Sequence, residues 1–344
     1  MPMFFPDATR AVIRTLDSQD IINSGTKGVL VNTFHLWQEI NTNTLEKSNG
    51  IGNFMNFKGG IISDSGGFQV MSLIKSGEMK GKVTDEGVVM YPSRNKKVVL
   101  TPEKSIAFQI SLGTDMVVVL DDFTDPDSTH DEAERSVERT IEWAKRSKKE
   151  FEKLTKGKKQ KPYLLGVSQG GYYQDLRKYC TEELVKIGFD GLGYGGWPLN
   201  KDGSFDYESA RTISDNSPED YLLYGLGIGK PEEIVELTKM GYSIFDCVLP
   251  TRDARHKRLY LYTAKSYKDI TLKGKFYTYY TPDRSAYTDD LSSISEACDC
   301  LLCKNYSKAY LAHLFKKEPM SAMRLSTIHN LRFYSMLMEK LQNS

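Results

Sequence analysis

Short apolar runs alternate along the chain with longer stretches whose apolar residues recur at helical spacing. Seven runs rich in β-branched and large apolar residues predict strands, which cover residues 28–32, 59–63, 115–120, 163–167, 189–194, 221–228 and 242–245. Repeated alternation of strand and helix predicts a parallel sheet. The strands number close to eight, and no dinucleotide-binding glycine fingerprint follows the first. The pattern therefore favours an α/β fold of the (β/α)₈ TIM barrel type over a doubly wound sheet.

The clearest helical pattern begins at Thr129, which is spaced with Glu132 as a capping box. A second helix is predicted from Pro231, with two glutamates in its first turn. After residue 252 the alternation ends, and helical stretches near 304–317 and 320–341 close the chain. We expect one domain over residues 1–344. In it, about 1–252 and the closing helices form the barrel, and about 253–344 includes a smaller metal-binding subdomain.

Carboxylates, an amide and paired glycines stand at or just after the ends of five of the predicted strands. They are Asp64, Asp121, Asp122, Gln169, Gly195, Gly196 and Asp246. A single aspartate in such a position is more often a helix N-cap or a turn residue. In a barrel, however, the carboxyl ends of all strands meet at one face, where active sites are built. The set as a whole therefore predicts one polar pocket at the mouth of the barrel.

The composition describes a soluble globular protein that can bury a sizeable core, with 40% hydrophobic and 26% charged residues. The net charge of +1 carries no information about partners, so any polyanion must be bound by local clusters. The densest charged block, residues 145–162, is either a solvated helix end or a phosphate-contacting patch. The chain has no apolar run long enough for a membrane span and no signal peptide, so we expect a cytoplasmic protein.

Three cysteines lie within six positions, in the spacing C-x-C-x₂-C. They are Cys298, Cys300 and Cys303. With one histidine they would make a closed tetrahedral set for Zn²⁺ with a structural role, because no position is left for a reactive water. Spacing alone leaves His329 and His313 as alternatives for the fourth ligand. Cys180 and Cys247 stand alone and are better explained as packing residues than as nucleophiles.

Long motifs occur together in this chain. They are SDSGGFQ over 63–69, FDCVLPTR over 245–252, and the cysteine cluster followed by a histidine. Together they resemble the tRNA-guanine transglycosylase (queuine tRNA-ribosyltransferase) family in its bacterial form. The resemblance runs from about Pro6 to the C-terminus, and further motifs fall in the family's order at 32–36, 120–122, 169–170, 195–196 and 229–231.

The resemblance implies a barrel with a structural zinc, which exchanges the wobble guanine of tRNA for a 7-deazaguanine through a covalent intermediate. Asp246 matches the family's nucleophile and Asp64 its general acid/base. The residues that match the base-binding positions are Asp121, Gln169 and Gly196 at the purine edge, with Phe68 and Leu226 on its faces. Arg252 and Arg255 match RNA-binding arginines, and His329 matches the fourth zinc ligand. The family likeness also implies a homodimer.

Elementary chemistry agrees with these assignments. A carboxylate can trap an oxocarbenium-like C1′ as an ester, and a second carboxyl can move the proton of the base. Two alternatives remain, namely the same exchange on DNA and a non-catalytic RNA-binding partner subunit. Retention of both Asp64 and Asp246 argues against the second. Phe68 replaces the family's usual tyrosine, and the bulky segment 197–200 follows Gly196. The incoming base therefore stays open among the aminomethyl form, the nitrile form and queuine.

Overall fold

The computed structural model describes residues 1–93, 96–282 and 287–343. Its central feature is a sheet of eight parallel strands in the order β1-β11-β10-β9-β8-β7-β3-β2. These strands are β1 Met3–Pro6, β2 Gly28–Val31, β3 Gly60–Ser63, β7 Met116–Val118, β8 Tyr163–Ser168, β9 Gly191–Tyr194, β10 Leu222–Gly225 and β11 Tyr242–Cys247.

The two outermost strands of this order meet, which closes the sheet. Asp7 forms a parallel bridge with Leu30, and the amide of Ala8 donates to the carbonyl of Leu30 at 2.7 Å. One step further, the amide of Asn32 donates to the carbonyl of Thr9 at 3.0 Å. The predicted (β/α)₈ barrel is therefore confirmed.

All seven predicted strands are present, most of them shortened by one to four residues. The eighth, β1, lies in the segment MFFP at the start of the chain, which the strand pattern did not identify. Four apolar residues that end in proline carry no alternation, and β1 is recognised only by its pairing with β11. The β11 strand also runs through Asp246 to Cys247, so Asp246 is a strand residue rather than the first residue after the strand.

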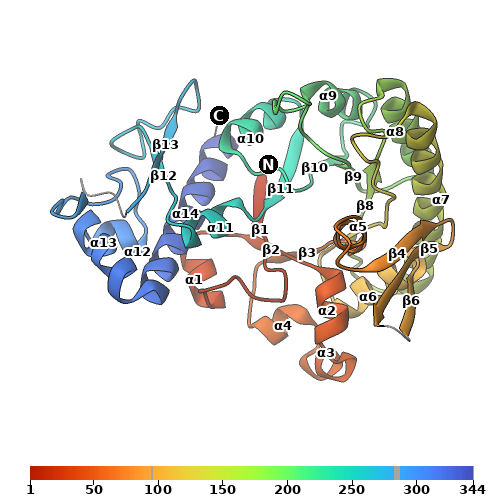
Figure 1. Ribbon diagram of the computed structural model, residues 1–344, viewed down its shortest axis with the longest axis horizontal. Coiled ribbons are helices and arrows are strands. Elements are labelled where there is room, and N and C mark those ends of the chain that lie inside the picture. Colours follow the sequence, from red (N-terminus) through yellow and green to blue (C-terminus); the bar gives the residue numbers. More distant parts are fainter. Residues whose placement is uncertain (94–95, 283–286, 344) are drawn as a thin grey trace.

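Helices follow the strands and cover the outside of the barrel (Figure 1). They are α1 Ser18–Asn23, α2 Thr33–Glu39, α3 Thr42–Ser48, α4 Ile51–Met55, α5 Gly67–Lys75, α6 Pro102–Leu112, α7 His130–Thr155, α8 Gln174–Ile187, α9 Tyr207–Asp215, α10 Pro231–Lys239 and α11 Leu249–Arg255. The capping box of Thr129 and Glu132 forms as predicted and begins α7. Pro231 is the first residue of α10, also as predicted.

Two additions interrupt the repeating pattern. An antiparallel sheet of β4 Lys80–Thr84, β5 Gly87–Ser93 and β6 Lys96–Leu100 lies between α5 and α6. After the barrel strands, the hairpin of β12 Leu259–Tyr262 and β13 Tyr277–Tyr280 precedes α12 Leu301–Asn305, α13 Lys308–Lys317 and α14 Pro319–Gln342. The hairpin, α12 and α13 gather on one side of the barrel and the β4–β6 sheet on another, while α14 returns to the barrel beside β1 and α11 (Figure 1).

The register of the strands defines which side chains face the barrel interior. Phe5 pairs with Asp246, and a Cβ built on Gly28 would lie 2.3 Å from the Phe5 ring. Gly28 pairs with Gly60, where a built Cβ would lie 3.7 Å from the same ring. One ring on β1 therefore reaches across two neighbouring strands, which is possible only inside the barrel. Phe5, Gly28, Gly60 and Asp246 all belong to the inward set.

We predict that Gly28→Ala destabilises the barrel by about 1–3 kcal/mol, because the added methyl overlaps the Phe5 ring and the Gly60 carbonyl. Gly60→Ala is the matched control, since its methyl would make an ordinary contact with the same ring. Denaturant unfolding followed by far-ultraviolet circular dichroism measures both variants. Equal stability of the two would contradict the interior packing of Phe5.

Candidate active site and metal centre

Inward-facing side chains continue along each strand to the mouth of the barrel. Leu30 pairs with Ile62, so Asn32 and Asp64, two residues further on, point to the same interior. Asp246 is inward by its pairing with Phe5. Neighbouring strands around the barrel thus bring these groups to one end, as the sequence predicted for Asp64 and Asp246.

Asp64 is held by donors from the segment that follows β2. The side-chain amide of Asn32 donates to Oδ2 at 2.6 Å, and the backbone amide of Thr33 donates to Oδ1 at 2.8 Å. The amide of Gly66 also donates to Oδ1, at 3.1 Å. Burial nevertheless raises the pKa of Asp64 to about 7, and the negative charges of Asp7 and Asp246 add to this rise. Asp64 can therefore be either protonated or ionised near neutral pH.

Asp246 is held by β10 and the loop that follows it. The hydroxyl of Tyr224 and the amide of Gly227 each donate to Oδ1 at 2.8 Å. Both bonds go to Oδ1, and within the described part of the chain Oδ2 accepts neither of them. Burial raises the pKa of Asp246 to about 6, with a further contribution from Asp7. The group is thus ionised near pH 7 but weakly solvated, which suits a nucleophile.

Asp121 and Gln169 form a second polar group, at the ends of β7 and β8. The Gln169 side-chain amide donates to Asp121 Oδ2 at 2.6 Å, and its carbonyl accepts from the Thr124 amide at 3.2 Å. Burial raises the pKa of Asp121 to about 6. Gly195 and Gly196 follow β9 beside this pair, and a Cβ built on Gly195 would lie 2.6 Å from Gln169 Nε2. Only glycine at residue 195 leaves room for the Gln169 side chain.

A buried arginine supports this second group. Arg177 of α8 donates to the carbonyls of Ser168 at 2.6 Å, Gly195 at 2.8 Å and Gly171 at 2.9 Å. Its guanidinium also lies 5.0 Å from the centre of the Tyr194 ring. One cation therefore ties the turns after β8 and β9 together. Sequence analysis missed Arg177, because a cation within an amphipathic helix carries no mark that it points inward.

Aromatic and apolar side chains flank the mouth. Phe68, in the first turn of α5, is 54% exposed and contacts the edge of Phe123 at 5.3 Å between ring centres. Leu226 lies over β9, where a Cβ on Gly193 would come within 2.6 Å of it. Trp197, directly after Gly196, is 49% exposed. The predicted pair Phe68 and Leu226 thus comes from opposite sides of the barrel, α5 and the turn after β10.

The two predicted arginines lie on α11, immediately after β11. Arg252 is half-exposed, 4.0 Å from Asp253, and Arg255 donates to the carbonyl of Thr251 at 2.9 Å. Burial lowers the pKa of Arg255, and the charges of Arg14 and Arg252 lower it further. These three cations therefore form a local positive cluster beside the acidic mouth. Sequence analysis did not identify Arg14, which precedes the predicted strands.

The charged block at residues 145–162 lies elsewhere. The end of α7 leads into the start of β8, at the end of the barrel opposite the mouth. Lys145 pairs with Glu142 and Lys153 with Glu150 on the same helix. This placement favours the solvated helix end over a contact with a substrate held at the mouth.

The cysteine cluster forms a compact donor set. The thiols of Cys298, Cys300 and Cys303 and one imidazole nitrogen of His329 are buried and lie within 4.8 Å of one another. His329 Nδ1 is 3.5 Å from the sulfur of Cys300 and 3.2 Å from that of Cys303. On the other side of the ring, Nε2 lies 2.8 Å from the Tyr260 carbonyl, which leaves Nδ1 as a lone-pair donor toward the sulfurs.

These distances suit a tetrahedral metal ion. Bonds of about 2.3 Å to sulfur imply edges of about 3.8 Å between ligand atoms. His329 is the fourth member, as the resemblance implied. The other candidate, His313 on α13, stacks with Tyr310. The four residues join the segment before α12, and α12 itself, to α14, so the cluster links the C-terminal extension to the barrel.

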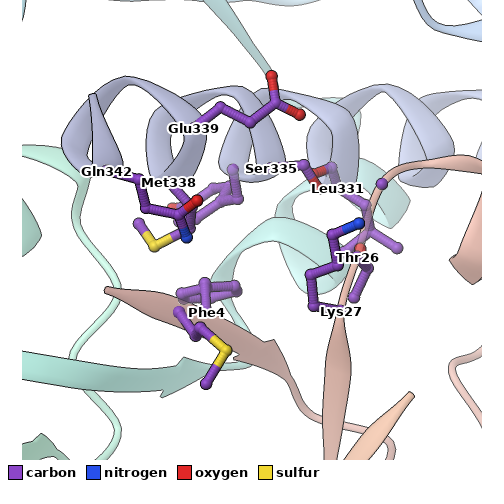
Figure 2. A pocket seen from close by; sticks show the side chains of 11 residues that line it. Phe4, Thr26, Lys27, Leu331, Ser335, Met338, Glu339 and Gln342 are labelled. Carbon is purple, nitrogen blue, oxygen red and sulfur yellow. The ribbon is translucent and has the colours of Figure 1, made fainter. Parts of the chain in front are cut away.

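A small cavity of about 40 Å³ lies far from the mouth (Figure 2). Its walls are the start of β1, the segment before β2 and one face of α14, and it is lined among others by Phe4, Lys27, Leu331, Ser335 and Glu339. Its volume suits about one or two water molecules. Because it lies at the amino ends of β1 and β2, it is separate from the site at their carboxyl ends.

Comparison with known proteins decides the family. The family model described as queuine tRNA-ribosyltransferase matches residues 1–344. The chain is 38% identical over 344 residues to proteins named queuine tRNA-ribosyltransferase from Tolumonas auensis, Shewanella sp. strain W3-18-1 and Shewanella frigidimarina. These alignments cover 100% of the chain and 86% of each relative. The chain belongs to the queuine tRNA-ribosyltransferase family. Membership makes it a pentosyltransferase, and the resemblance found in the sequence is confirmed.

The described residues include no helix with the length and apolarity of a membrane span.

Two inward groups at the mouth, Asp7 and Tyr224, were absent from the sequence prediction. Asp7 escaped notice because β1 was not recognised, so its position at a strand end could not be seen. Tyr224 lies inside an apolar run, where its hydroxyl gave no sign of pointing at Asp246.

Proposed function

We propose that this enzyme exchanges the wobble guanine of tRNA for a 7-deazaguanine by double displacement. The observation that carries the proposal is the pair of inward carboxyl groups, Asp64 and Asp246, which interact electrostatically at one mouth. Family membership supports the reaction class. A binding subunit would have no use for two such acids, whose burial is costly.

In the first displacement, Asp246 Oδ2 attacks C1′ of the target nucleotide. The bond between C1′ and N9 breaks, and its electron pair leaves with the guanine, which takes a proton from Asp64. In the second displacement, Asp64 accepts the N9 proton of the incoming base, and N9 attacks C1′. Asp246 then leaves as a carboxylate. Two inversions retain the configuration of the sugar.

The second polar group recognises the base. The carboxylate of Asp121 accepts from the N–H groups of a guanine-like edge, and Gln169 can both donate and accept. Glycine at 196 allows the backbone to approach the base closely. Phe68 and Leu226 hold its two faces once it has left the stack. Arg252 and Arg255 bind the phosphates that flank the target nucleotide.

The metal is proposed to be a structural Zn²⁺, because three thiolates and one imidazole are the donor set that this ion prefers. Four protein ligands would fill its tetrahedral coordination, so no position would remain for a reactive water. We further propose that residues 1–344 fold as one domain, in which the cluster fastens the segment after residue 252 to α14. A homodimer remains an expectation from the family likeness.

Asp246→Asn is expected to lower guanine exchange by on the order of 10⁴-fold or more, because an amide cannot form the ester. Incorporation of labelled guanine into unmodified tRNA measures the loss. A covalent adduct of protein and RNA on denaturing gels should also disappear. Asp122→Asn is the matched control, since Asp122 pairs with Arg139 instead. Near-normal exchange by Asp246→Asn would remove the covalent mechanism.

A bell-shaped pH profile of kcat/KM is expected. Activity should rise as Asp246 ionises around pH 6 and fall as Asp64 loses its proton around pH 7. Tyr224→Phe removes a hydrogen bond that lowers the pKa of Asp246, so the acidic limb should move to higher pH. The alkaline limb should stay in place. A profile that moves as a whole, or not at all, contradicts the assignment of the two limbs.

Cys300→Ser is expected to reduce bound zinc from about one ion per chain to near zero and to lower the thermal midpoint. Mass spectrometry of the metal content and thermal melting measure the two effects. His329→Ala should behave in the same way, whereas His313→Ala should keep its metal. Full zinc occupancy in the Cys300 or His329 variant would refute the ligand set.

A further inference from the structure

The mouth of the barrel divides into two chemically different halves. Around the sheet, β11, β1, β2 and β3 are consecutive neighbours. Their carboxyl ends carry Asp246, Asp7, Asn32 and Asp64. The base-recognition group of Asp121 and Gln169 lies just after β7 and β8. The half built on β11 to β3 therefore faces the sugar, because the proposed nucleophile and acid belong to it.

Asp7 is the unassigned member of the sugar half. Phe5 pairs with Asp246 and points into the barrel, so Asp7, two residues further along, also points inward at the level of the mouth. Its charge acts on Asp64, Asp246 and Tyr224, which places its carboxyl group beside them. The charges of His35 and Arg255 act on Asp7 in turn, so it lies between the acids of the mouth and the cation on α11.

The Asp7 carboxyl group can still accept a hydrogen bond from a ligand. Its Oδ1 accepts from the Thr9 hydroxyl at 2.9 Å, and no ion pair to Asp7 within 4 Å occurs among the described residues. The residue is half-buried rather than sealed. A carboxylate next to other acids is unfavourable, and burial raises its pKa. A neutral hydroxyl donor is therefore a better partner for it than a phosphate.

The geometry of the reaction supplies such a donor. In a β-nucleoside the base lies on one face of the ribose, and the 2′ and 3′ oxygens lie on the other. An attack that displaces the base comes from that other face, so Asp246 lies on it. Asp7, which directly follows the adjacent strand β1, then lies on the same face. Within an RNA strand the 3′ oxygen is esterified, which leaves the 2′-hydroxyl as the free donor on that face.

We propose that Asp7 binds the 2′-hydroxyl of the target nucleotide and makes the enzyme select RNA over DNA. This inference rests on the proposed function and adds to it a residue that reads the sugar. Asp7 is a binding and specificity residue here, because it touches a hydroxyl and takes no part in bond breaking.

The test compares two synthetic anticodon stem-loops that differ only at the target position, guanosine in one and 2′-deoxyguanosine in the other. Incorporation of labelled guanine gives kcat/KM for each. The unaltered enzyme should prefer the ribose substrate by about ten- to hundred-fold, the range for a hydroxyl bound to a charged group. Asp7→Ala should lower activity on the ribose substrate and bring the ratio close to one.

Asp7→Asn keeps the shape and one acceptor oxygen, so its ratio should lie between those of the unaltered enzyme and Asp7→Ala. It also tests the proposal if the alanine variant does not fold, which circular dichroism reveals. Asp121→Asn is the matched control. This substitution removes an acid from the base-recognition group of Asp121 and Gln169. It should lower kcat/KM for both substrates equally, which leaves the ratio of ribose to deoxyribose activity unchanged.

The outcomes separate the two proposals. No exchange on either stem-loop by the unaltered enzyme, when full-length tRNA also fails, contradicts the proposed function itself. Exchange with equal kcat/KM on both stem-loops leaves that function intact and overturns the role of Asp7. An unchanged preference in both Asp7 variants overturns it as well, because Asp7 would then act only through its charge on Asp64 and Asp246.

Discussion

Closure of the sheet between β1 and β2 is the constraint on which the site depends. The bond from the Ala8 amide to the Leu30 carbonyl and the bridge at Asp7 fix the register of the first strand. Because side chains alternate across a strand, a slip of one residue would turn Phe5 and Asp7 out of the barrel. The same register lets the Phe5 ring fill the space left by Gly28 and Gly60. The packing of Phe5 inside the barrel thus fixes the orientation of the carboxyl groups in the next layer toward the mouth.

The carboxyl groups at the mouth are buried at an electrostatic cost to the stability of the fold. Burial and the charge of Asp7 raise the pKa of Asp64 to about 7 and that of Asp246 to about 6, and the charge of Asp246 adds to the rise at Asp64. Such groups lower the stability of the folded state near neutral pH, since burial disfavours their charged forms. The separation of the two values gives one group that holds a proton near neutrality and one that does not. Both groups accept hydrogen bonds that favour their ionised forms, whereas only the pKa of Asp64 is also raised by the charge of the other catalytic candidate, Asp246.

The helix α14 connects the cluster of Cys298, Cys300, Cys303 and His329 to the segments at the mouth of the barrel. His329 belongs to this helix, and one residue later Asn330 donates to the carbonyl of Pro250 at 2.9 Å, in the first turn of α11. Further along, the hydroxyl of Tyr334 donates to the carbonyl of Gly229 at 2.6 Å, in the loop after β10. The cluster therefore lies on a helix that contacts the loop after β10 and the first turn of α11. This loop supplies the Gly227 amide and α11 carries Arg252 and Arg255, so the position of α14 bears on the geometry of the mouth.

Local pattern determined the barrel class, seven of its strands, the capping box of α7 and the main carboxylates, because each of these depends on residues near one another in the chain. The cysteine spacing likewise marked a metal cluster, whereas distance along the chain could not choose between His313 and His329. Only the tertiary structure revealed β1, and with it Asp7, since a four-residue apolar run becomes a strand by pairing with a partner about 240 residues away. The inward direction of Arg177 and Tyr224 was decided in the same way. Which face a side chain takes depends on register and closure, and those are properties of the assembled sheet.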